Sequence, residues 1–275
     1  MNLKIELRKY GFVTINHLPY ITEQVKNVIE SWKEFCALPL IVKTLFKYNG
    51  DAIRNKDTGY EFKNKTIPAT DQKENFHFTL DDLPRITEIA QQHKVDPSLI
   101  FNVSSLLKEI IVPICEFTKL LGDQFNLPGL RDELYAGREK WVLRCLHYFP
   151  TQVGEIIASQ HVDKLGITIY LGETTSGVQY YTRNNKWRNL PVLSDKTVIT
   201  PNMQMQYKTR GELKALCHRV VANTESARQG RYSIVCFADF LQTPPYNKEK
   251  YGRTQNLPPG FNYGMNHKEF SKFFM

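Results

Sequence analysis

The sequence predicts a mainly β protein, in which a jelly-roll core with flanking helices follows a helical N-terminal third. Before Arg138 the apolar residues recur mostly at helical spacing, and after it short runs of β-forming residues alternate with turn residues. The 275 residues, 41% hydrophobic and 12% aromatic, can bury one large core or two small ones. Many short antiparallel strands beside helices are typical of a β-sandwich or jelly roll.

The N-terminal third begins with a predicted strand and a predicted amphipathic helix. Residues 10–16 alternate and are rich in β-forming side chains, which favours a strand. Thr22 can cap the helix, which should end before Pro39. Its apolar stripe contains Val25, Val28, Ile29, Trp32, Phe35 and Cys36.

A long loop and a long helix follow. Residues 48–75 are rich in Asn, Lys, Thr and Gly and predict a loop region, with a weak strand signal at Tyr60-Glu61-Phe62. Loops of this length often carry function. Residues 98–121 return to helical spacing, with Gly122 as the expected terminator and Pro113 as an expected kink.

The remaining strands are predicted in short runs between turns. Turn signals at Asn184-Asn185, Ser194-Asp195 and Arg210-Gly211 fit hairpins. No repeat or linker divides the chain, so we expect a single domain over residues 1–275, with a helical region 1–138, a jelly-roll core 139–240 and a C-terminal cover 241–275. The predicted strands cover residues 141–149, 167–171, 178–182, 197–200, 216–221 and 231–237.

Composition restricts the partners and the compartment. The net charge of +8 is spread along the chain without a nucleic-acid reading helix or an aromatic platform, so we expect no nucleic-acid partner. We see neither a signal h-region nor a run long enough to span a bilayer, and therefore expect a cytoplasmic protein without a membrane partner. The sequence leaves the oligomeric state open, with a monomer as the default. The five cysteines predict free thiols; Cys217 beside His218 would face the opposite side of a strand and is a weak candidate ligand.

Two histidines and one aspartate are candidate metal ligands. His161 and Asp163 are one residue apart, so on a strand or strand end they point to the same side. His218 follows on a later predicted strand. Two imidazoles and one carboxylate are the ligand set of a non-haem iron centre, and they leave positions open for substrate and dioxygen. By itself His-x-Asp is a weak signal, because a surface aspartate beside a hydrogen-bonded histidine gives the same pattern.

A second motif, Arg231 and Ser233, predicts an anchor for a carboxylate. The two side chains share one face of a predicted strand. The planar fork of an arginine matches a carboxylate, and serine adds a donor beside it. A 2-oxo dicarboxylate could therefore bind the metal through its oxo group and first carboxylate, and reach Arg231 and Ser233 with its far carboxylate.

Together these motifs resemble the 2-oxoglutarate and Fe(II)-dependent dioxygenase superfamily, in particular its isopenicillin N synthase-like branch. The order and spacing of His161-x-Asp163, His218 and Arg231-x-Ser233 carry most of the resemblance. It extends over almost the whole chain, through Tyr10-Gly11-Phe12, Asn16-His17, Phe35 to Pro39, Lys73-Glu74-Asn75-Phe76, Leu143 to Pro150, Gly177-Val178-Gln179, Lys186-Trp187 and His218-Arg219-Val220.

The resemblance implies a double-stranded β-helix and a reaction. His161, Asp163 and His218 would hold Fe(II), and Arg231 and Ser233 would bind the distal carboxylate of 2-oxoglutarate. With O2, 2-oxoglutarate would be decarboxylated to succinate while a small organic substrate is hydroxylated, or desaturated or cyclised.

The chain departs from the family pattern at three places. His147 and Phe149 stand where Asn and Tyr are common; Phe149 lacks a hydroxyl that often helps to hold the co-substrate, and His147 could replace a polar contact there or be a core histidine. Asn202-Met203 replaces a usual Gly-Asp before the distal histidine, although Gln206 stands where Gln is common.

Substrate contacts and alternatives stay open at this point. Tyr60, Phe62, Tyr170 and Phe270 are candidate substrate contacts only by their positions in the resemblance, and core packing is the alternative for the C-terminal phenylalanines. An Fe(II) and O2 oxidase that does not use 2-oxoglutarate is the main alternative function. A non-catalytic binding module on the same barrel is less favoured, because the predicted triad is complete.

Overall fold

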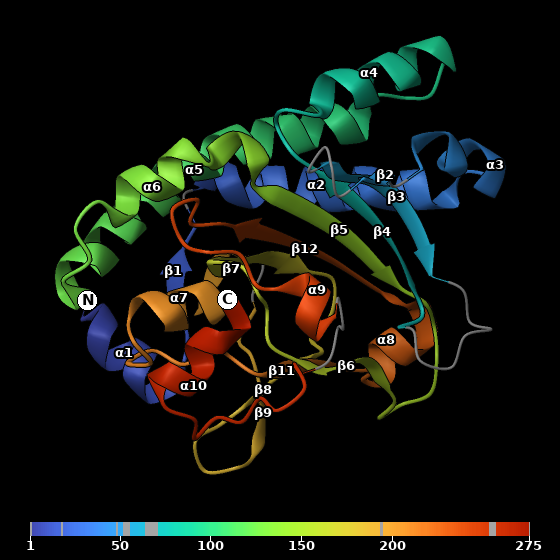
Figure 1. Ribbon diagram of the computed structural model, residues 1–275. Helices are drawn as coiled ribbons and strands as arrows, with labels where there is room; N and C mark the ends of the chain where they lie inside the picture. The colour runs from blue at the N-terminus through green and yellow to red at the C-terminus, as the bar shows by residue number, and fades with distance from the viewer. Residues whose placement is uncertain are drawn as a thin grey trace.

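The computed structural model describes residues 2–17, 19–47, 49–51, 56–63, 71–192, 195–252 and 257–274. Within them, two antiparallel sheets face each other, with helices against the outer side of the larger sheet (Figure 1). The larger sheet runs in the order β1 (Val13–Asn16), β10 (Lys196–Pro201), β7 (Ile167–Glu173), β12 (Arg231–Ala238), β5 (Val142–Tyr148), β4 (Lys73–Phe78), β3 (Lys56–Lys63) and β2 (Asn49–Asp51). The smaller sheet runs in the order β6 (Ile156–His161), β11 (His218–Val221), β8 (Val178–Tyr181) and β9 (Trp187–Asn189).

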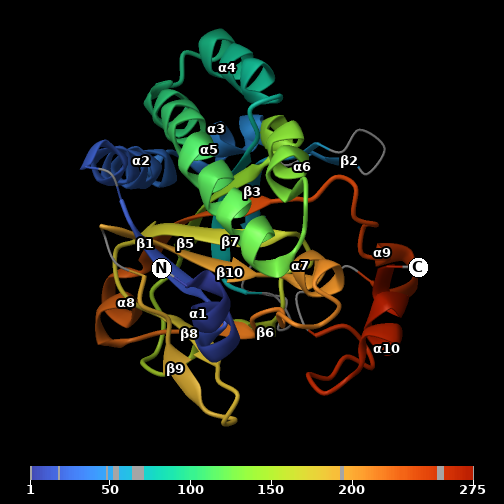
Figure 2. The ribbon, with the colours of Figure 1, turned by 90° about the vertical axis from the view of Figure 1, so that its left-hand side faces the viewer.

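This arrangement confirms the predicted jelly roll with flanking helices. Its main core lies between the larger sheet and α2 (Pro19–Ala37) and α5 (Ser98–Phe125), which pack side by side (Figure 2). A second apolar cluster fills the space between the two sheets, and a third joins the C-terminal segment to the barrel. The remaining helices are α1 (Leu3–Tyr10), α3 (Leu40–Lys43), α4 (Leu83–Gln92), α6 (Leu130–Ala136), α7 (Met203–Lys208), α8 (Thr224–Gln229), α9 (Lys248–Tyr251) and α10 (His267–Ser271), with 3-10 turns η1 (Thr44–Phe46), η2 (Arg138–Lys140) and η3 (Lys272–Phe274).

Two predicted helix boundaries are wrong. α2 begins at Pro19, whose fixed φ suits a first helical position. Thr22, the predicted cap, lies inside the helix, with its hydroxyl oxygen 3.3 Å from Nδ1 of His17. α5 continues past Gly122 and ends at Asn126, which adopts the left-handed conformation. Gly122 is needed inside the helix, because a Cβ there would lie 2.9 Å from the carbonyl oxygen of Leu127.

The length of α5 also corrects the expectation that no run could span a membrane. By length and mean hydropathy α5 would be long and apolar enough. However, its buried side chains contribute to the main core, and it packs against α2 and α6, which is the usual position of a core helix.

The expected loop over residues 48–75 contains strands. β2, β3 and β4 extend the larger sheet, and β4 is buried along its whole length because it pairs with both β3 and β5. Residues 48, 52–55 and 64–70 of the predicted loop lie outside the described residues.

The turn predictions had mixed outcomes. Asn185, with φ of 57°, lies in the β8–β9 hairpin as predicted. Arg210-Gly211 instead follows the short helix α7, where its two positive φ angles reverse the chain towards β11. Ser194 lies outside the described residues. The five cysteines are free thiols, as expected.

Candidate metal centre

The two predicted histidine ligands meet across the smaller sheet. His161 ends β6 and His218 begins β11, and they are direct partners in the antiparallel register. Asp163 follows two residues after the end of β6. Nε2 of His161 lies 3.7 Å from Oδ1 of Asp163, Nε2 of His218 lies 3.8 Å from Oδ2, and the two imidazole centroids are 4.2 Å apart. The structure therefore brings together all three residues predicted from spacing.

Backbone carbonyls hold both imidazoles in an orientation suited to a metal. Nδ1 of His161 lies 2.7 Å from the carbonyl oxygen of Ser159, and Nδ1 of His218 lies 3.1 Å from that of Leu216. Because a carbonyl only accepts, each Nδ1 carries the proton and each Nε2 presents its lone pair to the shared space. Burial, followed by the nearby His218, lowers the pKa of His161, so its imidazole is neutral at neutral pH.

The third ligand is held by a chain of side-chain hydrogen bonds. The Thr168 hydroxyl donates to Oδ2 of Asp163 at 2.6 Å, and Nδ2 of Asn202 donates to the Thr168 oxygen at 2.8 Å. Burial alone would raise the pKa of Asp163, but the two histidines and the Thr168 bond outweigh it and lower that pKa, so the carboxylate is ionised. Asn202 stands where the family commonly has Gly-Asp, and no motif in the sequence indicated its part in this chain of bonds.

These donors fit Fe(II). Each of the three side chains offers one ligand atom, and these atoms all lie within 4.8 Å of one another. Two imidazoles and one carboxylate on one side of an octahedral ion leave its other positions to small molecules. Such a set is suited to an open, reactive centre more than to a closed structural site.

The ligands open into a cavity of about 270 Å³ between the two sheets. Apolar side chains from both sheets form much of its wall, namely Leu146, Val178, Val220, Val235 and Phe237. Arg231 and Ser233, the predicted carboxylate anchor, also line it, and both are buried. The metal ligands and the predicted anchor thus share one small, largely apolar cavity.

The hydrogen bonds of Arg231 leave a pair of donors available. Nε donates to the carbonyl oxygen of Thr175 at 3.1 Å, Nη1 donates to the Ser233 hydroxyl at 3.1 Å, and Nη2 donates to Glu173. A guanidinium has five N–H groups, so one on each terminal nitrogen has no partner among the described residues, and two such N–H groups can bind a carboxylate. The guanidinium carbon lies 5.4 Å from the ring centre of Tyr148.

His147, predicted to contact the co-substrate, lies on the other face of β5. The residues of β5 that line the cavity are Arg144, Leu146 and Tyr148, which share one face by the two-residue repeat of a strand. Nδ1 of His147 instead lies 2.8 Å from Glu74, and its ring stacks on Tyr232 with centroids 4.1 Å apart. The prediction for His147 therefore disagrees with its position. Tyr148 brings to the cavity the kind of aromatic hydroxyl that Phe149 lacks.

Three of the four predicted substrate contacts are also outside this cavity. Tyr60 is buried against Phe35 and donates to Glu74 at 2.6 Å. Phe62, 45% exposed, is on the same face of β3 as Tyr60 and lies near Phe149. Phe270 packs among the C-terminal aromatic residues, in agreement with the alternative prediction of core packing. Tyr170 does line the cavity, with its ring edge-on to His218.

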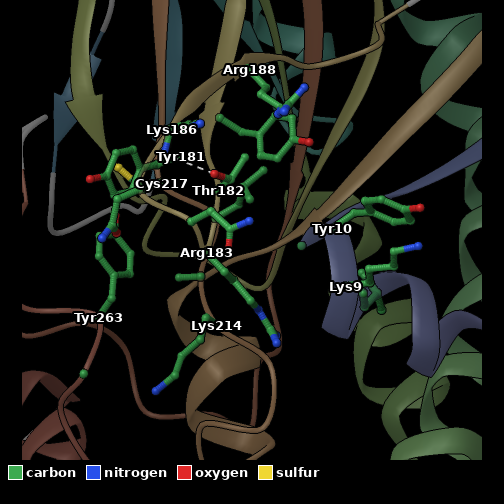
Figure 3. Close-up of a pocket in the computed structure, with 18 of the residues that line it drawn as sticks. Lys9, Tyr10, Tyr181, Thr182, Arg183, Lys186, Arg188, Lys214, Cys217 and Tyr263 are labelled. Carbon is green, nitrogen blue, oxygen red and sulfur yellow. Dashed lines mark hydrogen bonds between the residues drawn. The ribbon is translucent and has the colours of Figure 1, made fainter.

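Two other features of the molecule resemble sites. A second group of side chains with metal-ligand atoms consists of Cys36, Glu74 and His147. The Glu74 carboxylate already accepts a hydrogen bond from the Lys43 ammonium group at 2.7 Å, and this positive charge disfavours a metal cation there. A larger cavity of about 1050 Å³ lies between the β8–β9 hairpin, α1 and the chain before β11 (Figure 3). Its lining is basic and contains none of the three metal ligands; the cations are Lys9, Arg183, Lys186, Arg188 and Lys214.

A double-stranded β-helix that joins two imidazoles and a carboxylate in its interior defines the class of non-haem metal oxygenase barrels. Comparisons with known proteins agree with this class. Residues 142–239 match the model of the 2OG-Fe(II) oxygenase superfamily. The matched segment contains His161, Asp163, His218, Arg231 and Ser233, and it confirms over these residues the resemblance that the motifs predicted.

Individual relatives are distant. The chain is 25% identical over 263 residues to 1-aminocyclopropane-1-carboxylate oxidase homolog 3 of Arabidopsis thaliana, covering 93% of this chain and 67%, about two thirds, of that protein. A 2OG-Fe(II) oxygenase family protein of Caulobacter crescentus has a similar fold, with 22% identity, a TM-score of 0.71, and coverage of 98% of this chain and 91% of that one. A full-length Neurospora crassa protein, solved in complex with alpha-KG and thymine, gives 16% identity, a TM-score of 0.72, and coverage of 98% and 89%.

Proposed function

We propose that the protein is an Fe(II)- and 2-oxoglutarate-dependent oxygenase that oxidises a C–H bond of a small organic molecule. One observation carries this proposal: His161, Asp163 and His218 share a cavity with Arg231 and Ser233. The first three suit a metal with open positions, and the other two suit the far carboxylate of a 2-oxo diacid bound to that metal.

The overall reaction balances. Substrate, 2-oxoglutarate and O2 give hydroxylated substrate, succinate and CO2, with one oxygen atom of O2 in the hydroxyl and the other in succinate. Bound Fe(II) would supply the activation of dioxygen. Desaturation or ring closure is an alternative outcome of the same oxidation.

The chain's own residues bind, orient and exclude water. Arg231 and Ser233 fix the far end of 2-oxoglutarate, so that its oxo acid end is directed to the three ligands. The same cavity has apolar wall residues, namely Leu146, Val178 and Val220. Such a wall keeps water out and strengthens the charge interactions inside the cavity.

Several features support a small substrate. The cavity, about 270 Å³, lies just below the usual range for ligand pockets. The N. crassa structure holds thymine, a small molecule, in a similar fold.

We infer membership of the isopenicillin N synthase-like branch from the sequence motifs. The single domain, the cytoplasmic location and the monomeric state stay predictions.

The test is metal and co-substrate dependence. We expect the protein loaded anaerobically with Fe(II) to show the visible charge-transfer band of a chelated 2-oxo acid when 2-oxoglutarate is added, and to release succinate on exposure to O2. His161→Ala and Asp163→Ala should lose iron, whereas His93→Ala, at the exposed end of α4, should keep it. Normal iron content and turnover in His161→Ala would end the assignment. Substrate oxidation without 2-oxoglutarate would instead favour the Fe(II) and O2 oxidase.

A further inference from the structure

A second arginine, Arg144, enters the same cavity and forms no ion pair with the described residues. It lies on β5 and lines the cavity beside Leu146 and Tyr148. Its Nε is buried and makes no hydrogen bond within the described part of the chain, and no ion pair of Arg144 occurs there. The guanidinium lies over the ring of Phe237, 4.7 Å from its centre. Arg231, in contrast, already has three partners.

The strand register separates Arg144 from the co-substrate anchor. On the antiparallel pair β5 and β12, Arg144 lies opposite Val235, while Tyr148 lies opposite Arg231. Four residues along a strand correspond to about 13 Å. A 2-oxoglutarate molecule held by Arg231 and the metal does not need Arg144, because its two carboxylates are already bound.

The same register places Arg144 level with the metal end of the cavity. Tyr170 on β7 lies opposite Val235, and Thr168, which holds Asp163, lies opposite Phe237. β7 and β5 flank β12 on its two sides, so Arg144 is about 10 Å across the sheet from β7, whose Thr168 donates a hydrogen bond to Asp163. A molecule beside the metal would therefore lie within reach of this side chain.

The charges of the cavity show an unmatched positive end. Lys73 is paired with Asp71 at 3.0 Å, and Asp163 faces the metal position. Lys248 and Lys164 add positive charge to the lining. Glu61, two strands from Arg144, accepts from Asn75 at 3.1 Å. The acidic side chains of the described lining are Asp71, which pairs with Lys73, and Asp163, which the charge of Arg144 reaches but which faces the metal position. With 2-oxoglutarate on Arg231, Arg144 still faces a small, partly apolar space and has no ion pair of its own among the described residues.

We propose that Arg144 binds a carboxylate of the primary substrate, so that the enzyme oxidises a small carboxylic acid at a carbon a few bonds from its acid group. The inference rests on the proposed function and names its substrate class. A planar guanidinium fork suits a carboxylate, and an ion pair in a cavity that excludes water orients the substrate as well as binding it. The carboxylate directs the far carbon of the molecule towards His161, Asp163 and His218.

The experiment compares acids with their neutral carboxamides. Protein loaded with Mn(II) and 2-oxoglutarate is mixed with butanoate, octanoate, phenylacetate or 3-phenylpropanoate, or with the matching amide, and thermal unfolding and the dissociation constant are measured. We expect at least one acid, and not its amide, to raise the melting temperature of the wild type. Arg144→Gln should raise the dissociation constant of that acid about 10- to 100-fold, and Arg144→Lys should raise it less. Arg188→Gln, at an exposed position, should leave it unchanged.

The outcomes separate this inference from the proposed function. Failure of the wild type to bind 2-oxoglutarate with metal would contradict the proposed function before any acid is added. With that complex intact, the inference fails if no acid in the panel stabilises the wild type, if amides stabilise it equally, or if Arg144→Gln keeps the acid effect. Loss of 2-oxoglutarate binding in Arg144→Gln would also overturn it, by assigning Arg144 to the co-substrate.

Discussion

The hydroxyl of Thr168 donates a hydrogen bond of 2.6 Å to Oδ2 of Asp163 and so fixes the carboxylate that completes the metal centre. Oδ1, 3.7 Å from Nε2 of His161, receives no hydrogen bond from the described residues and is the oxygen available to a metal. Thr168 is itself held by Asn202, in a position buried from solvent. The orientation of the ligand thus depends on residues that do not touch the metal.

Replacing Thr168 by valine should weaken metal binding. The side chain keeps nearly the same shape but loses the donor, and removal of such a supporting bond costs about 10- to 100-fold in metal affinity. Titration with Fe(II) or Mn(II) measures this, and Thr168→Ser, which keeps the hydroxyl, should retain most of the affinity. Equal metal affinity in Thr168→Val and wild type would show that Asp163 is fixed by other contacts.

Replacing Arg231 by lysine should raise the 2-oxoglutarate requirement and leave metal binding unchanged. Lysine keeps the charge near Glu173 but cannot offer two parallel donors to a carboxylate. We expect the apparent dissociation constant of 2-oxoglutarate to rise about 10- to 100-fold, measured by the charge-transfer band. Ser233→Ala, which removes only one neighbouring donor, should have a smaller effect. An unaltered constant in Arg231→Lys would place the far carboxylate elsewhere.

The metal ligands could be predicted because their chemistry is local. His161 and Asp163 carry their geometry in their spacing, and His218 and Arg231 add order along the chain. The residues around them depend on which face of a strand points inwards, and a shift of one residue reverses that face. This is why Tyr148 lines the cavity where His147 was expected.

The same reasoning explains what the sequence left open in the fold. Most strands of the jelly roll were found within two residues, because their β-forming runs are bounded by turns. β6, which ends in Ser-Gln-His, and the three-residue β9 lack such a run and were not predicted. β4 was hidden in a polar segment, since Lys73, Glu74, Asn75 and His77 are buried only through contacts with distant strands.

Gly59 should tolerate no side chain. Its φ is +110°, and a Cβ there would lie 2.6 Å from the carbonyl oxygen of Phe46. Because backbone cannot easily move away, we expect Gly59→Ala to lower the free energy of unfolding by about 2 kcal/mol or more. Gly129→Ala is the matched control, since Gly129 also has a positive φ but faces open space. Similar losses in both variants, measured by urea unfolding, would attribute the effect to φ alone.

Glu74 should govern the loss of stability in acid. Its carboxylate is buried between Lys43 Nζ at 2.7 Å, the Tyr60 hydroxyl at 2.6 Å and His147 Nδ1 at 2.8 Å. Burial alone would raise the pKa of Glu74, but hydrogen bonds from His147, Lys43 and Tyr60 outweigh it and lower the pKa to about 2. A depressed pKa stabilises the folded state above the unfolded pKa, here 4.5, and this stabilisation, about 3 kcal/mol, is lost as the pH falls from there to about 2.

Glu74→Gln should therefore destabilise the protein at pH 7 and flatten its acid dependence. The variant leaves the buried Lys43 ammonium without its counter-charge, so we expect a loss of about 3 kcal/mol in the free energy of unfolding at pH 7. The difference from wild type should shrink as the pH falls below 4.5, because protonation removes the same charge from Glu74. Urea unfolding between pH 7 and pH 3 measures both effects, with exposed Glu155→Gln as the control. Parallel pH curves for Glu74→Gln and wild type would show that Glu74 is not the carboxylate responsible.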